Sequence, residues 1–484
     1  FAMNNSANLI ANITQQIPRF VYMVLQPTLH LISQSFISII IVVGLLYINP
    51  ALAIISISVI GGVYALIYWT VRKRMIYAGE VITEVTKRKL LLLNESIMGI
   101  KEVKLSGIES WYGNELDHTT RNGLNASAFA GLAGDIPKFI VETIVFSAIL
   151  VLAIYLLFTQ GTEGGTISSL SFYAMAGYKI LPAAQTAYKS ISSLQANGQV
   201  IGIIQRELNK AEQHCSKSDL LPEPVQSPIQ FNKLNIELQD IRFTFPGKET
   251  PALDGLNLQI KQHQMIAFVG SSGAGKSTTV DIILGLLKPE RGALLIDGVE
   301  VTSKNLRGWQ SKVGYVPQNI FLLDDSILKN IAFGVPESEI NLEKAILAAK
   351  KANIHSFIED LPNGYMTTVG ERGGQLSGGQ RQRIGIARAL YQEPEILILD
   401  EATSALDTVT ERQILSEIHE LAKNTTIIMI AHRLSTIKDS DVIFVFDHGK
   451  VVAHGKYEEL IDSSPEFNEF IHAHERSNAT SPTA

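Results

Sequence analysis

The longest uncharged stretch of the chain limits its fold more than any other feature: residues 20–71 contain no Asp, Glu, Lys or Arg. A bilayer core of about 30 Å is crossed by about 20 apolar residues of helix, so this stretch is too long for one membrane span and suits two. Asn49-Pro50 divides it, and such a pair is typical of a turn. We therefore predict spans near residues 26–48 and 52–71.

Two more spans are predicted near residues 139–158 and 167–188, the second of which contains Lys179 and Pro182. A run of basic residues separates the second span from the third: Arg72, Lys73, Arg74, Lys87, Arg88, Lys89, Lys101 and Lys104. The positive-inside rule then places residues 72–137 in the cytoplasm. The alternative, a buried helix pair of a soluble protein, is disfavoured by this charge asymmetry and by the length of the uncharged stretch.

The cytoplasmic segment 72–137 favours helix and contains no proline before Pro137. Two antiparallel helices of about 25 residues would project roughly 35–40 Å beyond the membrane, at 1.5 Å per residue. Their tip is predicted near Gly107-Ile108-Glu109-Ser110-Trp111. A projection of this length implies that the tip contacts another part of the protein.

The remainder of the chain is predicted to be a soluble domain that a linker joins to the membrane spans. Residues 209–235 are polar and contain three prolines, as linkers do, and residues 473–484 are predicted to be a mobile tail. We therefore predict a transmembrane domain over residues 1–208 and a soluble domain over residues 236–472.

Composition narrows the functional classes. The chain is 46% hydrophobic and only 18% charged, which is too apolar for an ordinary soluble enzyme of this size. The net charge of −6 argues against a nucleic-acid partner, which needs a basic face. Cys215 is the only cysteine, so an intrachain disulfide is excluded. The chain starts at Phe1, within helical sequence, and we expect the natural N-terminus to lie upstream.

Three compact apolar runs in the soluble domain, residues 264–269, 396–399 and 426–430, are typical of buried parallel strands. Each leads directly into polar or glycine-rich residues. Ligands of open α/β sheets collect at the carboxyl ends of the strands. We therefore expect the motifs after these three strands to form one site.

The first motif is a P-loop between a strand and a helix predicted over residues 278–287. Its backbone N–H groups and the positive helix end suit phosphate. Lys276 is predicted to reach the β- and γ-phosphates of ATP, and the Ser277 hydroxyl to bind Mg²⁺. The predicted nucleotide-binding residues are Gly270, Ser271, Ser272, Gly273, Ala274, Gly275, Lys276, Ser277 and Thr278.

The second and third motifs supply acid–base groups. Asp400, at the end of an apolar strand, suits the Mg²⁺ shell, and Glu401 is placed to orient or deprotonate the attacking water. Taken alone, the two carboxylates could instead cap the next helix. His432 follows the strand 426–430 and is predicted to contact the γ-phosphate, although a lone histidine at a strand end is more often structural.

The fourth motif is Leu376-Ser377-Gly378-Gly379-Gln380, before an amphipathic helix predicted over residues 381–390. Ser377 and the N–H groups of Gly378 and Gly379 would make a second anion-binding helix start without a lysine. The chain thus carries two phosphate-binding helix starts, and Gln380 completes the second.

In this order the four motifs resemble the nucleotide-binding domain of ABC transporters over residues 236–472. The resemblance implies that Gln318 is the glutamine that touches Mg²⁺ and contacts the membrane domain, and that Asp407 belongs to the D-loop, residues 404–407. Glu371 matches the exporter-type X-loop. Phe245 occupies the position of the adenine-stacking aromatic, which is usually Tyr; a phenyl face also stacks.

The family implies a head-to-tail homodimer in which Ser377 of one subunit closes over ATP held by Lys276 of the other. It also implies an all-α transmembrane domain, with four of an expected six exporter helices present here, followed by an α/β P-loop NTPase domain. Residues 108–114 would form the coupling tip. The expected location is a bacterial inner membrane with the ATPase domain in the cytoplasm.

The substrate class stays open. Residues 94–113 and 178–188 look most like PglK-type lipid-linked oligosaccharide flippases, which favours an amphipathic lipid substrate; peptides, drugs and other lipids are alternatives. Lys179 either pairs with Glu142 or faces an anionic headgroup. A soluble ABC ATPase is disfavoured by the fused uncharged stretch, and a hydrolysis-poor ABC channel by Glu401.

Overall fold

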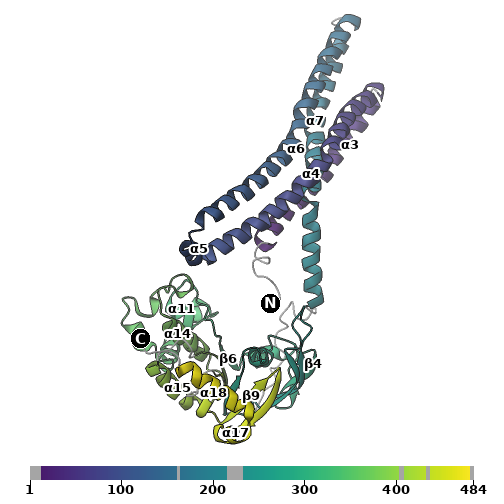
Figure 1. Ribbon diagram of the computed structural model, residues 1–484. Helices are drawn as coiled ribbons and strands as arrows, with labels where there is room; N and C mark the ends of the chain where they lie inside the picture. The colour runs from purple at the N-terminus through teal and green to yellow at the C-terminus, as the bar shows by residue number, and fades with distance from the viewer. Residues whose placement is uncertain are drawn as a thin grey trace. The chain divides into compact units, whose positions relative to one another are not determined.

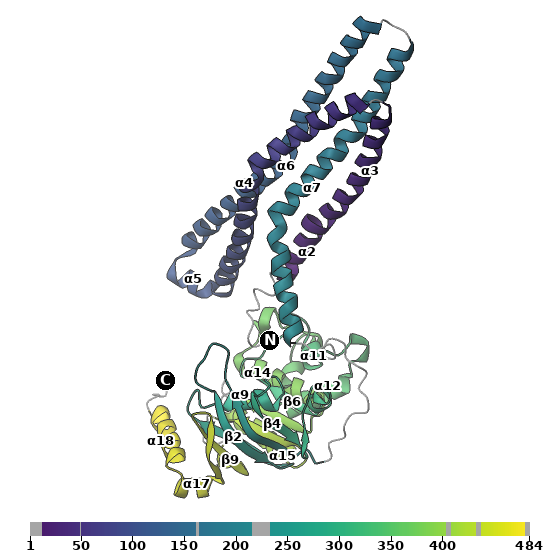
Figure 2. The ribbon, with the colours of Figure 1, turned by 90° about the vertical axis from the view of Figure 1, so that its right-hand side faces the viewer.

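The computed structural model describes residues 12–48, 50–160, 164–214, 233–402, 408–431 and 437–479. The chain divides into two compact units, Phe1–Leu221 and Pro222–Ala484. The first consists of helices and the second of helices and strands (Figures 1 and 2). Each unit is described separately below.

The helical unit is built from a few very long helices. Its elements are the π-helical segments Asn12–Gln16 and Val21–Leu25, with α2 (Ile17–Phe20) between them, followed by α3 (Gln26–Ile48), α4 (Pro50–Met98), α5 (Ile100–Ser106), α6 (Glu109–Gln160) and α7 (Gly164–His214). α3 coincides with the first predicted span, and α4 begins at Pro50 because proline fits the first position of a helix, where its missing N–H has no partner to lose.

Within the described residues, the stretches 12–47 and 53–98 are long and apolar enough to cross a membrane. Their apolar side chains point outward rather than into a core: Ile40 and Leu66 are each 71% exposed and Trp69 is 81% exposed. Such continuous apolar surface is costly in water. The third and fourth predicted spans lie in α6 and α7, and many of their side chains fall outside the described residues.

α4 continues well past the predicted second span and packs against the first part of α6 to form a long hairpin (Figure 1). The tip of this hairpin is α5 and Gly107, whose φ of 64° is left-handed; glycine adopts this conformation without strain. An ion pair of 3.4 Å between Lys104 and Glu109 spans the turn. The tip therefore lies slightly earlier than predicted, and residues 109–114 form the first turns of α6.

Two predicted boundaries are wrong. α7 continues to His214, so the linker cannot begin at residue 209; helix-forming residues and an ion pair of 3.0 Å between Lys210 and Glu207 support this extension. The tail predicted from residue 473 is helical as far as Ala479, because α18 (Pro465–Ala479) is anchored by the fully buried ring of Phe467.

The α/β unit contains two sheets. The first has the strand order β2 (Leu253–Ile260), β1 (Ile236–Phe243), β4 (Arg291–Ile296), β5 (Val299–Glu300), with antiparallel pairing throughout. The second has the order β10 (Lys450–Gly455), β9 (Val442–Asp447), β3 (Met265–Gly270), β8 (Thr426–Ile430), β7 (Ile396–Asp400), β6 (Val313–Val316). Its strands are parallel except at the β10–β9 edge. The three predicted strands are β3, β7 and β8.

Helices surround the second sheet. The remaining α-helices within the described residues are α9 (Lys276–Ile283), α10 (Leu306–Gln310), α11 (Ile327–Ile331), α12 (Leu342–Lys351), α13 (His355–Glu359), α14 (Gly378–Tyr391), α15 (Thr408–Ala422) and α17 (Tyr457–Ser463). One core cluster lies between the two sheets, where the fully buried Trp309 donates its indole N–H to the carbonyl of Ile283 at 2.7 Å. A second cluster joins the sheet to α11, α12 and α14.

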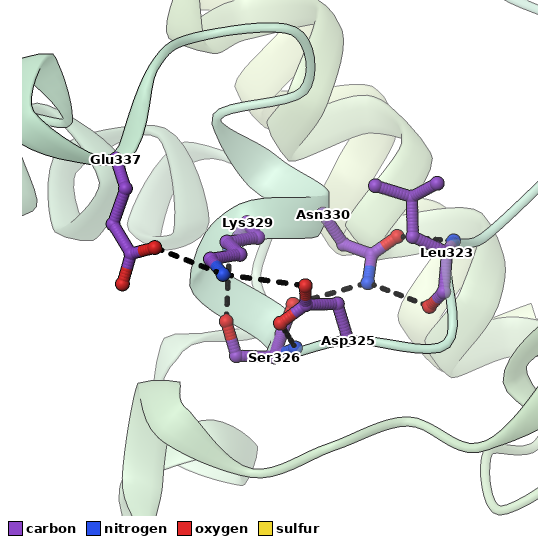
Figure 3. Close-up of polar contacts among 6 residues, drawn as sticks. All are labelled: Leu323, Asp325, Ser326, Lys329, Asn330 and Glu337. Atoms are coloured by element: carbon purple, nitrogen blue, oxygen red, sulfur yellow. Dashed lines mark hydrogen bonds and ion pairs between the residues drawn. The ribbon is translucent and has the colours of Figure 1, made fainter.

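The start of α11 is held by a network of polar side chains (Figure 3). The Ser326 hydroxyl accepts the backbone N–H of Lys329 at 3.2 Å and so caps the helix. The Lys329 ammonium lies 3.3 Å from the Asp325 carboxylate and 3.2 Å from Glu337. Asn330 donates to the carbonyl of Ser326 at 3.0 Å. The segment that follows Gln318 is thus fixed by local contacts.

Candidate nucleotide-binding and hydrolysis site

The strand order brings the predicted motifs to one edge of the second sheet. β3, β8, β7 and β6 are consecutive and parallel, so their carboxyl ends lie side by side. Gly270 ends β3 and Asp400 ends β7, while Gln318 follows β6. The end of β8 leads to His432, which lies outside the described residues, as does the D-loop with Asp407.

The P-loop joins the wholly buried β3 to α9, which begins at Lys276, two residues before the predicted helix start. Three glycines in this segment have positive φ, with Gly270 at 144° and Gly275 at 104°. A Cβ on Gly270 would lie 2.2 Å from the carbonyl oxygen of Phe446 in β9, and one on Gly275 would lie 2.7 Å from the side chain of Leu253. Only glycine fits at Gly270 and Gly275, in both conformation and space.

Lys276 is buried inside the loop, with 6% of its surface exposed. Its ammonium donates to the carbonyls of Gly270 and Ser271, each at 2.8 Å. Burial lowers the pKa of Lys276, and the carboxylates of Glu401 and Asp400 oppose that change. The charged side chain therefore sits at the centre of the loop and within the field of both carboxylates, while Ser277, the next residue, is exposed.

Asp400 lies among groups of like charge. Burial raises the pKa of its carboxyl, and the nearby Glu401 and Asp281 raise that pKa further, whereas a hydrogen bond with the Tyr315 hydroxyl and the charge of Lys276 lower it. Asp281, one turn of α9 beyond Ser277, and Tyr315 on β6 were not predicted; their spacing from Ser277 and from Gln318 is the only signal the sequence contains.

This donor set fits a magnesium ion that is held only partly by protein. The described residues contain no group of three or more His, Cys, Asp or Glu arranged to enclose a metal ion. Mg²⁺ is typically bound by one or two carboxylates together with phosphate oxygens and water. Asp400 and the Ser277 hydroxyl would supply ligands of this kind, and a bound cation would relieve the repulsion between Asp400 and the nearby Glu401 and Asp281.

The carboxylate of Glu401 is held by a glutamine from the segment that follows the neighbouring strand, β6. The side-chain amide of Gln318 donates to Glu401 Oε2 at 2.7 Å, so Gln318, predicted as a metal ligand, contacts the predicted catalytic carboxylate in this structure. Glu401 itself has a left-handed backbone with φ of 51°. Its carbonyl accepts a hydrogen bond of 3.2 Å from the amide of Gln382 in α14.

The second predicted anion-binding motif starts α14, a helix of 14 residues. Ser377 is its N-cap: the hydroxyl accepts the N–H of Gln380 at 3.2 Å, and the Gln380 side chain accepts the N–H of Ser377 at 2.8 Å. Arg381 donates to the carbonyl of Leu376 at 2.7 Å. Gly378 and Gly379 form the first turn, next to the positive end of the helix dipole. α14 packs with α11, α12 and β6.

Phe245 lies between β1 and β2 and is 38% exposed. Its ring meets Phe243 edge to face, with 5.0 Å between the ring centres, and an aromatic ring of this kind can stack on a planar ligand. Glu371, the predicted X-loop residue, starts a short 3₁₀ segment, Glu371–Gly373, and is exposed.

Residues 253–404 match the family described as ABC transporter. The ATP-dependent lipid A-core flippase of Saccharophagus degradans is 36% identical over 381 residues, which cover 78% of this chain and 62% of that protein. The flippase of the same name from Francisella novicida is 35% identical over 375 residues, covering 76% and 61%. The ABC multidrug transporter mdr1 of Aspergillus fumigatus is 43% identical over 237 residues, covering 49% of this chain and 18% of the relative.

A solved structure resembles nearly the whole chain. The bacterial Atm1-family ABC exporter with ATP bound matches with a TM-score of 0.79 and 25% identity, covering 98% of this chain and 82% of that one. Fold and site together define an ABC-type ATPase domain that follows a helical domain. Over most of its length the chain resembles ABC transporters of the exporter type.

The predicted resemblance to ABC exporters and the predicted fold class are confirmed. The PglK type stays a prediction, because the flippase relatives carry a different name. The chain spans about three fifths of the length of these flippases.

Proposed function

We propose that this chain forms the ATPase-bearing part of an exporter that moves an amphipathic lipid across a bacterial inner membrane, with the ATPase domain in the cytoplasm. The observation that carries the proposal is the meeting of Lys276, Asp400, Glu401 and Gln318 at one sheet edge, in a chain that also contains two helices long and apolar enough to cross a bilayer.

In this proposal, the P-loop binds ATP through its N–H groups and Lys276. Lys276 exchanges its carbonyl partners for phosphate oxygens, and its proximity to Asp400 and Glu401 keeps it charged. Ser277, Asp400 and Gln318 would hold Mg²⁺, which neutralises the phosphate charge when bound. Phe245 stacks on the adenine. Glu401 accepts a proton from the attacking water, and His432 contacts the γ-phosphate.

The second anion site implies a second copy of the chain. Ser377 caps the start of α14, where the positive end of the helix dipole favours phosphate. The lysine that is proposed to bind phosphate, however, lies in the P-loop. A head-to-tail homodimer lets Ser377, Gly378, Gly379 and Gln380 of one subunit close over the ATP of the other, which gives two equivalent composite sites.

The substrate proposal rests on Lys179. Lys179 is exposed on α7, whereas Glu142, its alternative partner, lies 3.9 Å from Lys138 one turn away on α6. A lysine within a span is costly in lipid and is expected to face protein, water or an anionic group. We therefore favour a lipid with an anionic headgroup, such as a lipid-linked oligosaccharide or a lipid A-type glycolipid; the relatives' name, lipid A-core flippase, supports this class.

The test is stimulation of ATP hydrolysis by the purified protein in liposomes. Addition of a polyprenyl-pyrophosphate-linked oligosaccharide or of a lipid A-type glycolipid is expected to raise the rate, and the two separate arms distinguish the substrates. Lys179→Gln should abolish the stimulation and keep the basal rate, while the matched change Lys189→Gln, whose residue pairs with Asp135 at 2.9 Å, should keep both. Stimulation only by cationic peptides or drugs would overturn the lipid proposal.

A further inference from the structure

One side chain outside the motif roles reaches the hydrolysis site. Gln382 lies in the second turn of α14 and is 3% exposed. Its side-chain amide donates to the backbone carbonyl of Glu401 at 3.2 Å. This contact joins the helix that begins at the Ser377 turn to the residue that follows β7.

The backbone at Glu401 needs such a contact. Its φ of 51° is left-handed, a conformation that is strained for a non-glycine residue and persists where surrounding contacts hold it. Gln382 holds the carbonyl of Glu401, and Gln318 holds the carboxylate at 2.7 Å. Two amides from different elements therefore locate one carboxylate.

We propose that Gln382 is a positioning residue for hydrolysis: its amide keeps the Glu401 peptide in the left-handed conformation that directs the carboxylate toward the attacking water. This inference rests on the proposed ATPase function. Because α14 also carries Ser377, the helix that is proposed to close over the partner's ATP holds the catalytic carboxylate of its own subunit. Displacement of α14 would then move Glu401 through the hydrogen bond of Gln382 with the Glu401 carbonyl.

Gln382→Met tests this directly, since methionine has similar length and no donor. The expected result is a fall in kcat of about tenfold with KM for ATP changed less than about twofold, because ATP binding uses Lys276 and Phe245 rather than Gln382. Gln310→Met is the matched control: the Gln310 amide also donates to a backbone carbonyl, that of Leu284 at 3.0 Å, away from Glu401. Its kcat should equal the wild-type value.

Gln382→Glu provides a second variant that is nearly isosteric. A carboxylate opposite the Glu401 carbonyl repels it instead of donating to it, so kcat should fall at least as far as in Gln382→Met. Wild-type kcat in both variants would overturn the inference, and so would a loss that appears mainly as weaker ATP binding.

A double-mutant cycle with Glu401→Gln separates positioning from general damage. If Gln382 acts through Glu401, then Gln382→Met lowers the single-turnover rate in the wild-type background and not in the Glu401→Gln background. Equal losses in both backgrounds would overturn the inference. The wild-type protein tests the proposed function separately: absence of any ATP hydrolysis by the wild-type protein would contradict the proposed function itself.

Discussion

The Gln318 amide and the Glu401 carboxylate form a hydrogen bond of 2.7 Å across the carboxyl ends of β6 and β7. The residue expected to touch the metal ion thus contacts the expected catalytic carboxylate. The two roles are compatible in space, since an amide presents an oxygen acceptor as well as N–H donors. Gln318 can therefore offer its oxygen to the ion while its N–H orients Glu401.

Glu401→Gln is expected to separate binding from hydrolysis. The substituted amide keeps the size of the side chain but cannot accept the proton of water, so turnover should fall by about 10²-fold or more. Affinity for ATP, measured by displacement of a fluorescent nucleotide, should stay near the wild-type value. Near-normal turnover in the purified variant would remove Glu401 from the role of base.

Gln318→Leu should act on the same step through the loss of orientation. The expected fall in kcat is about tenfold, smaller than for Glu401→Gln because the carboxylate remains present. Raising the Mg²⁺ concentration should restore part of the activity if the amide oxygen also contributes to the metal site. A change in KM for ATP without a change in kcat would contradict both roles.

Mixed subunits test the composite sites. Ser377→Arg blocks the closing turn and Lys276→Ala removes the phosphate-binding lysine, so a homodimer of either variant should be nearly inactive. In a heterodimer isolated with two different tags, one composite site keeps both the intact Lys276 and the intact Ser377. That heterodimer is expected to recover up to about half of the wild-type activity. Inactive heterodimers, beside active wild-type dimers that carry the same tags, would argue against sites shared between subunits.

Substitution of the half-buried Asp281 is expected to stabilise the folded protein in a pH-dependent way. Burial raises the pKa of Asp281, so the folded state favours its protonated form, and stability is lost as pH rises through the folded-state pKa. Asp281→Asn carries no charge to bury. It should raise the midpoint of thermal unfolding at pH 7 and leave it unchanged at about pH 3, below the unfolded-state pKa of about 3.9.

The measurement for Asp281→Asn is thermal unfolding without nucleotide and in the presence of EDTA. Asp462→Asn, which changes an exposed residue of α17, is the matched control and should leave the midpoint unchanged at both pH values. A gain for Asp281→Asn that is equal at both pH values would show that burial of the charge is not its cause.

Two glycines of the P-loop should differ sharply in their tolerance of alanine. Both have positive φ, but a Cβ on Gly270 would lie 2.2 Å from the Phe446 carbonyl oxygen, whereas Gly273 faces open space. Gly273→Ala should cost only the backbone strain, about 1 kcal/mol. Gly270→Ala must also separate β3 from β9 and should abolish ATP binding. Chemical denaturation and nucleotide binding measure the two effects; equal costs would contradict the geometry.

Many of the helices, strands and motifs of this protein could be predicted from patterns among residues that are close in sequence. The start of the first span, the break at Pro50, the P-loop, β7 and β8 all depend on consecutive residues: uncharged length, a proline, closely spaced glycines or an apolar run. The Ser377 cap depends on Gln380, three residues away. The prediction errors lie at the end of α7 and in α18. The polar residues of these two segments are typical of a linker or a tail, but they form helices.

The contacts that locate Glu401 were decided by tertiary structure alone. Gln318 and Gln382 approach it because β6 pairs with β7 and because α14 packs with β6, and neither arrangement leaves a pattern in neighbouring residues. The same is true of Asp281 and Tyr315, which influence Asp400 from α9 and β6. The sequence by itself determined which residues are proposed to carry the chemistry, because those signals are local. Only the tertiary structure determined which other side chains position those residues, because the order of strands in the sheet depends on pairing between segments that are distant in sequence.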